Sequence, residues 1–176
     1  MIYAAIAIVI LVFVYIAIYN NLRSLNIKVE EAASGIEVAL TKRYDVLVKL
    51  LDITKGYAKH EKEVLTETVR LRKGMSGSEM KEADKNINEG FRGISVVGEA
   101  YPTLLSNENF KQLQLAAADT EEHLQAARRL YNSNVTAFNT SIVTFPSNIV
   151  ASLMKLQQKE FFEAEEAKKQ DVKMEF

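Results

Sequence analysis

The chain begins MIYAAIAIVILVFVYIAIY, Met1 to Tyr19, a stretch without a charged side chain; the first one is Arg23. A helix rises about 1.5 Å per residue, so this stretch reaches roughly 28 Å, close to the hydrocarbon thickness of a bilayer. No other part of the sequence resembles it. The pattern predicts a transmembrane anchor over residues 1–20, with the lipid bilayer as a partner.

Two other interpretations of this stretch fit less well. A secretory signal peptide has a basic start, an apolar run of about 7–15 residues and a small-residue cleavage site. Here the run is longer, and Tyr19-Asn20-Asn21-Leu22 follows it. A buried helix of a soluble core suits apolar runs of about 10–14 residues. We therefore expect a retained anchor.

The basic residues near the span predict its orientation. None precedes it, whereas Arg23 and Lys28 follow it, with Lys42 and Arg43 slightly further along. Lys and Arg are enriched on the cytoplasmic side of membrane spans. We expect a single-pass protein with its N-terminus outside and its helical body in the cytoplasm.

The composition of the rest limits its class. Residues 21–170 have the length of one domain, followed by a charged tail at 171–176. Lys and Arg number 22 against 23 Asp and Glu, a balance that disfavours nucleic acid as a partner. The absence of cysteine excludes disulfides, thiolate catalysis and Cys-based metal sites.

The body reads as a series of long helices. Between Leu22 and Lys73 there is no proline, and apolar or small residues recur at helical steps of three, four and seven. This stripe contains Ala33, Ile36, Leu40, Leu47, Leu50, Tyr57, Val64 and Leu71. With no breaker after Tyr19, the first helix is expected to continue from the membrane span as one rod.

Three further helices are predicted after a turn at residues 74–78. The second begins at Ser78 as N-cap and stops near Tyr101-Pro102; the third runs from Ser106 or Asn107 to Phe145-Pro146. The fourth starts at Pro146 or Ser147 and is expected to carry Ile149, Leu153, Leu156, Phe161 and Phe162. The fold class is all-α: an N-terminal transmembrane helix continuing into an elongated antiparallel four-helix bundle. Because the helices are unequal in length, we expect a homo-oligomer.

Several charged residues fall on the apolar stripes. Arg43 lies seven residues from both Ile36 and Leu50, and Glu61 lies fourteen residues after Leu47. A lone buried ion costs several kcal/mol, so each needs a partner. Candidate partners are Arg72, Glu99, Glu121 and Arg128. We favour a structural polar network that fixes helix register, and place catalysis by Glu61, Glu99 or Glu121 third among the possible functions.

No catalytic or metal motif supports an enzyme. The two histidines, His60 and His123, lack the Glu-x-x-His spacing of di-iron bundles. No phosphate-binding glycine loop or nucleophile motif is present. The sequence therefore predicts neither a cofactor nor an enzymatic activity.

Aromatic–amide pairs recur along the chain. They are Tyr19-Asn20, Tyr131-Asn132 and, one heptad later, Phe138-Asn139. In the simpler interpretation the aromatic ring packs in the bundle while the amide bonds across helices or to water. In the other, Tyr19, Asn20, Tyr131, Asn132 and Asn139 form a contact surface, since aromatics suit interfaces.

A set of short motifs follows in order between Tyr19 and Phe176: YNNL, LTKRYD, KGYAKHEKE, GEAYPTL, NENFKQLQ, TEEHLQAARRLYN, FNTSIVTFPSNIVA, FFEAEE and DVKMEF. Through these motifs the chain resembles the LemA family of bacterial membrane-associated helical proteins. The resemblance implies a bacterial cell membrane, a single N-terminal span and a helical bundle. It implies no catalytic activity, and some relatives are associated with organelle-like membrane structures. Where relatives tend to have Pro-Asn after the Arg-Tyr-Asp motif, this chain has Val48-Lys49, so its first helix should lack a proline kink.

Two functions follow as hypotheses. The first is a non-enzymatic membrane-anchored scaffold that self-assembles and organises membrane or partner proteins. The second is a signalling or regulatory adaptor that binds a protein or peptide in a groove between its helices.

Overall fold

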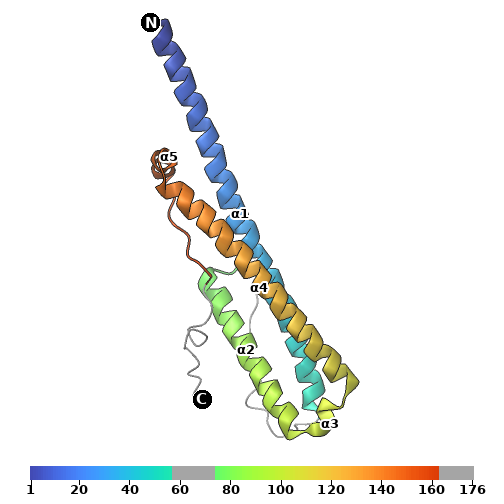
Figure 1. Ribbon diagram of the computed structural model, residues 1–176. Coiled ribbons are helices and arrows are strands. Elements are labelled where there is room, and N and C mark those ends of the chain that lie inside the picture. The colour runs from blue at the N-terminus through green and yellow to red at the C-terminus, as the bar shows by residue number, and fades with distance from the viewer. Residues whose placement is uncertain (57–73, 163–176) are drawn as a thin grey trace, which may run out of the picture.

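The computed structural model describes residues 1–56 and 74–162 and is all-helical there, without a strand (Figure 1). This confirms the all-α fold class and the continuation of the apolar helix into the bundle. The elements are α1 (Ile2–Lys55), α2 (Gly77–Ala100), α3 (Pro102–Leu105), α4 (Glu108–Val143) and α5 (Ser147–Leu153).

The helix starts follow from local capping. Asn107 is one of the two predicted caps of the third helix, and its Oδ1 accepts a hydrogen bond from Phe110 N at 3.2 Å. The cap of α2 is Ser76 rather than the predicted Ser78. Ser76 Oγ accepts from Glu79 N, and Glu79 Oε2 accepts from Ser76 N at 2.7 Å, which forms a capping box.

Long-range contacts fix the directions of the helices. Gly74 N donates to Glu37 Oε2, and further along Arg43 meets Asp84, so α2 runs parallel to α1. Asn134 Nδ2 donates to the Lys28 carbonyl while Arg43 meets Glu121, so α4 is antiparallel to α1.

The antiparallel order is therefore right for α1 and α4 and wrong for α1 and α2. In the structure α1 ends at Lys55, and the described chain resumes at residue 74, where Gly74 lies beside Glu37 of α1. The part of the predicted first helix between 57 and 73 lies outside the described residues.

The predicted fourth helix is too long. It ends at Leu153, and residues 155–162, which include Leu156, Phe161 and Phe162, are not helical. Lys155 takes a left-handed conformation with φ of 53°, which turns the chain out of the helix. Beyond it, backbone groups of residues 159 and 162 bond to side chains of α4 instead of to a preceding turn.

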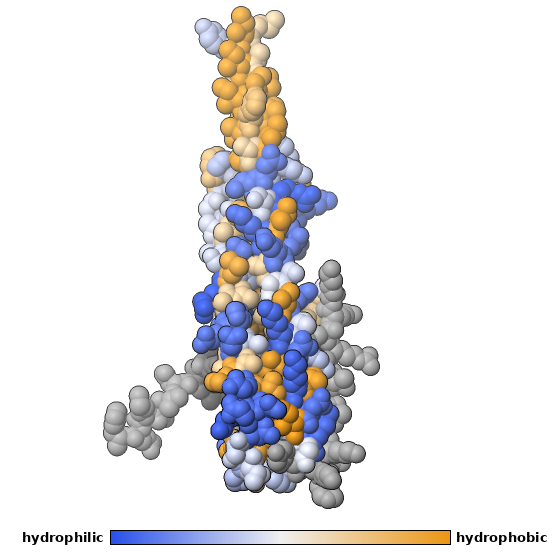
Figure 2. Space-filling model, turned by 90° about the vertical axis from the view of Figure 1, so that its right-hand side faces the viewer, coloured by the Kyte–Doolittle hydropathy of each residue, from blue (hydrophilic) through white to orange (hydrophobic). Residues whose placement is uncertain are grey.

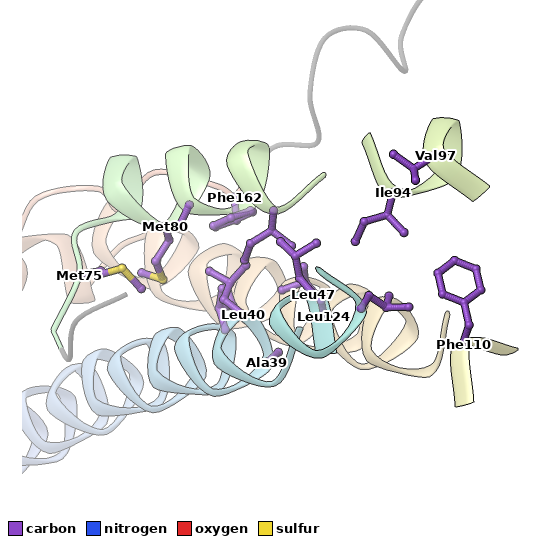
Figure 3. Close-up of a cluster of buried hydrophobic side chains, with 14 of the residues drawn as sticks. Ala39, Leu40, Leu47, Met75, Met80, Ile94, Val97, Phe110, Leu124 and Phe162 are labelled. Carbon is purple, nitrogen blue, oxygen red and sulfur yellow. The ribbon is translucent and has the colours of Figure 1, made fainter. Parts of the chain in front are cut away.

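Two apolar clusters hold the helices together. The larger joins α1, α2, α4 and Phe162, and Figure 3 shows its side chains, among them Leu40, Leu47 and Leu124, pointing toward one another. The smaller joins α1, α4 and α5. Its buried members are Leu22, Val29, Val135, Phe138, Ile142, Val150 and Ala151.

The N-terminal third of α1 projects from the bundle. Among the described residues, α1 is the one helix long and apolar enough to cross a membrane, and none of its apolar stretch is buried within the chain. Figure 2 shows this stretch as a hydrophobic rod above a body with many hydrophilic residues. Such an exposed apolar helix suggests membrane anchoring.

Candidate functional site

A buried ion network lies where α1, α2 and α4 meet, and consists of Arg43, Asp84, Asn88, Glu121 and Arg128. Arg43 Nη1 is 3.2 Å from Asp84 Oδ1, and its Nη2 is 2.6 Å from Glu121 Oε2. The same Nη2 donates to Asn88 Oδ1 at 2.9 Å. Arg128 Nη2 contacts the other oxygen of Asp84. One carboxylate thus joins two guanidinium groups from helices on either side.

Aromatic rings cover the two arginines. The guanidinium of Arg43 lies 5.2 Å from the ring centre of Phe91, and that of Arg128 lies 5.0 Å from the ring centre of Phe162. Such stacking stabilises a cation, most strongly when the site is desolvated. It also compensates in part for the Nε groups of Arg43 and Arg128, which have no hydrogen-bond partner among the described residues. Phe162 therefore ties the end of the described chain to the network.

Burial dominates the electrostatics of the network. Desolvation raises the pKa of Asp84 from its usual value, and the charges of Arg128 and Arg43 oppose that change. Desolvation likewise lowers the pKa of Arg43, against the charges of Glu121 and Asp84. Each ion thus depends on its neighbours for compensation, which is the property of a structural network.

The carboxylate oxygens of the network are engaged by protein groups. Both oxygens of Asp84 contact arginines. Glu121 binds Arg43 through Oε2 and accepts from Gln125 Nε2 through Oε1 at 2.6 Å. With side chains of Arg43, Asp84 and Arg128 exposed by 10% or less, the arrangement suits holding helices in register better than binding a substrate.

The structure brings together three of the six residues assigned from sequence to the polar network. Arg43, Glu121 and Arg128 meet, whereas Glu99 is exposed near the end of α2. Glu61 and Arg72 lie outside the described residues.

Sequence reasoning missed Asp84 and Asn88. A signal for Asp84 was present, because it lies four residues after Met80 and three before Ile87, on the apolar stripe of α2. The rule that singled out Arg43, a charge on an apolar stripe, applies equally to Asp84. For Asn88 we find no comparable signal.

A second polar site is the amide pair, Asn132 and Asn139 on α4. Asn139 donates to the carbonyl of Lys159 at 2.9 Å and accepts from its N–H at 2.8 Å. Asn132 does the same with Phe162, at 3.0 and 2.8 Å. A heptad on a helix covers about 10.5 Å and three residues of an extended polyproline-like chain about 9.3 Å, so the two spacings match. The side chains of the amide pair thus hold residues 159–162 against α4 by bonding to the backbone groups of that segment. The segment runs antiparallel to α4.

Tyr131 supplements the amide pair. Its hydroxyl donates to the carbonyl of Glu160 at 3.1 Å. Burial raises the pKa of Tyr131 from its usual value, and the charge of Glu160 adds to the effect. A cavity of about 170 Å³ opens beside it, lined by residues that include Val29, Met80 and Phe161.

The remaining two residues of the proposed contact surface lie elsewhere. Tyr19 packs against the smaller apolar cluster, with its ring centre 6.3 Å from that of Tyr15. Asn20 is exposed on α1. The structure thus groups Tyr131, Asn132 and Asn139 around the chain's own segment.

The fold and these sites define a class of protein: an α-helical bundle that is continuous with an exposed apolar N-terminal helix and contains a buried ion network where three helices meet. A family model described as the LemA family matches residues 32–176. Protein LemA of Metamycoplasma hominis is 30% identical over 165 residues, which cover 91% of this chain and 75% of that protein. The chain belongs to the LemA family.

More distant relatives have a more specific description. Magnetosome protein MamQ 2 of Paramagnetospirillum magneticum is 21% identical over 179 residues, covering 85% of this chain and 66% of that protein. Magnetosome protein MamQ of Magnetospirillum gryphiswaldense is also 21% identical, over 82% of this chain and 64% of its own length.

Proposed function

We propose that the protein is a non-enzymatic membrane-anchored scaffold that self-assembles and organises membrane or partner proteins. The observation that carries this proposal is the continuity of α1, a single helix of 54 residues. Its apolar start is exposed, and its later residues form one wall of the bundle. Such a helix couples the bundle rigidly to whatever surrounds its apolar end.

The proposed location is the bacterial cell membrane, with a single span, the N-terminus outside and the body in the cytoplasm. Arg23 and Lys28, both exposed on α1 just after the apolar stretch, support this orientation. The membership of the LemA family and the similarity to magnetosome proteins also favour a role at membranes.

Self-assembly is supported by apolar side chains on the outside of the body. Ile27 and Val38 on α1 are 61% and 54% exposed, and their separation of eleven residues puts them on one side of the helix. Leu115 and Leu130 on α4 are 66% and 58% exposed. Burying such residues against a second copy is favourable by about 25 cal/mol per Å². The absence of an enzymatic role is supported by the mutual engagement of the buried ions.

The test is the assembly state of the full chain in lipid nanodiscs, measured by native mass spectrometry and chemical cross-linking. We expect oligomers for the wild type and a shift toward monomers for Val38→Lys. The matched control is Ser24→Lys, at an exposed polar position of the same helix. A wild-type protein that stays monomeric at high density in the membrane refutes the self-assembling scaffold.

A second function, a regulatory adaptor, is favoured by the amide pair. Because Asn132 and Asn139 bind only backbone groups of residues 159–162, another extended peptide could replace that segment. A labelled peptide of residues 153–162 should bind the Phe162→Ala variant more tightly than the wild type. It should lose that binding when Asn132 is also changed to Ala. Equal, weak binding to all three proteins contradicts the adaptor.

A further inference from the structure

The corner between α4 and α5 carries an unusual group of exposed apolar side chains. Val143, Phe145, Ile149 and Leu153 are 55%, 80%, 55% and 69% exposed, and they occur within eleven residues of one another. The other face of α5 is occupied, because Val150 and Ala151 are buried in the smaller apolar cluster. We call the four exposed side chains the corner surface.

The corner surface lies where the apolar stretch of α1 ends. The cluster that buries Val150 and Ala151 also contains Leu22, with Ile18 and Tyr19 packed against it. Figure 1 shows α5 beside α1 at the base of its projecting N-terminal part. If residues 1–19 cross the bilayer, α5 is at the level of the lipid headgroups.

The charge around the corner surface also suits lipid. No Asp or Glu occurs between residues 123 and 159, or in the first 29 residues of the chain. Arg23 on α1 and Lys155, just after the end of α5, are exposed. Basic groups beside an apolar surface attract anionic headgroups, whereas acidic groups would be repelled. The exposed Thr144, Asn148 and Ser152 between the apolar residues fit the interface rather than the hydrocarbon core.

We propose that the corner surface is a second membrane contact, in which Phe145, Ile149 and Leu153 enter the headgroup–acyl boundary of the leaflet where α1 leaves the bilayer. This proposal rests on the membrane anchoring proposed above. One helix alone leaves the body free to tilt and rotate about its span. A second contact beside it fixes both, so that the same side of the bundle always faces the membrane.

The chain has no cysteine, so single cysteines can carry a fluorescent probe at chosen sites. The full chain with Phe145→Cys or Ile149→Cys is labelled with an environment-sensitive dye in phosphatidylcholine–phosphatidylglycerol vesicles. Lipids carrying a quencher near the headgroup or deep in the acyl chain report the depth of the dye. Ile10→Cys in the apolar stretch measures anchoring, and Ser95→Cys, exposed on α2 toward the far end of the body, serves as the unburied control.

The expected result is quenching at 145 and 149 by the shallow quencher that exceeds that at 95 by at least about twofold, since interfacial side chains lie about 5–10 Å deep. Probes at 10 should respond most to the deep quencher. If 10 is quenched while 145 and 149 behave like 95, the corner surface is not a membrane contact although the anchor is real. If 10 is not quenched either, anchoring itself fails. The proposal is also overturned if a second copy of the chain, and not lipid, covers the corner surface. In that case unlabelled chains of the Phe145→Cys variant form disulfide cross-links with one another, and the labelled variant is not quenched by the lipids.

Discussion

Removal of the charge of Asp84 should destabilise the protein more than any other single change in the buried ion network. Asp84 contacts both Arg43 and Arg128, and its side chain is 8% exposed. The substitution Asp84→Asn leaves two guanidinium groups buried with a neutral amide between them. Breaking a buried ion pair by removing one partner costs about 3–5 kcal/mol. In a chain of this size, that loss corresponds to a fall in Tm of about 6–20 °C.

Two variants calibrate this prediction. Glu121→Gln removes a partner whose side chain is 31% exposed, and Arg43 keeps Asp84 and Asn88. We expect a cost of about 1–2 kcal/mol, in the range of a hydrogen bond to a charged group. Glu89→Gln, also on α2, removes an exposed pair with Lys85 at 3.9 Å. Its cost should stay below about 0.5 kcal/mol, as for other surface pairs.

An apolar replacement separates a structural from a chemical role. The triple variant Arg43→Met, Asp84→Leu, Arg128→Met removes all three charges at once and should recover most of the stability lost in Asp84→Asn. The measurement is urea unfolding of the full chain in mild detergent, followed by circular dichroism at the helical minimum. The structural role of the ion network is refuted if the stability of Asp84→Asn lies within about 1 kcal/mol of that of the wild type, or if the triple variant is no more stable than Asp84→Asn.

Three further changes test the packing and the amide pair. Gly90→Ala places a Cβ 2.8 Å from a terminal carbon of Leu47, so the variant protein should be about 1 kcal/mol less stable although alanine has the better helix propensity. A double-mutant cycle with Leu47→Ala, measured by urea unfolding, should show a coupling energy of similar size. Asn132→Ala removes two hydrogen bonds to the backbone of residue 162, so the amide of that residue should exchange at least tenfold faster in hydrogen-exchange mass spectrometry. Exchange in α2 should not become faster. Unchanged exchange at residue 162 contradicts the contact. Tyr131→Phe should cost about 0.5–1.5 kcal/mol near neutral pH. Folding raises the pKa of Tyr131, so the stability that its hydroxyl contributes is present below the unfolded pKa of about 10 and is lost as the pH rises through the folded pKa. In urea unfolding at increasingly alkaline pH, the wild type should therefore lose its stability advantage over Tyr131→Phe. A difference in stability that stays constant with pH contradicts this prediction.

The periodicity of the sequence predicted the helices where the chain's own packing decides them. The apolar stripe of α1 is buried at Ile36, Leu40, Leu47 and Leu50, as a helix with one inward face requires. Arg43, placed on that stripe by its spacing, is buried with it. A buried charge of this kind can be recognised from the sequence because every residue on the buried face of a helix, charged or apolar, follows the same helical spacing.

The segment after α5 could not be predicted in the same way. Leu156, Phe161 and Phe162 have spacings compatible with a helix, and the local sequence contains no glycine or proline to end it. The non-helical conformation depends instead on Asn132 and Asn139, which lie twenty or more residues away and bond to backbone groups that a helix would have paired within itself. Tertiary contacts of this kind override local propensity and leave no local signal.

The buried ion network and the corner surface are connected through the axial register of α1 and α4. Arg43 on α1 and Glu121 on α4 meet in one alignment of the two helices. A slip of one heptad would break that contact and move α4, with α5 at its end, by about 10 Å along α1. The corner surface would then leave the level of Tyr19, where the apolar stretch ends. A network that penalises other alignments therefore also determines the position of the corner surface along the axis of α1, relative to its apolar stretch. The buried charges thus fix the axial register of the two helices. Apolar packing alone would fix it less well, because it tolerates slippage between long helices.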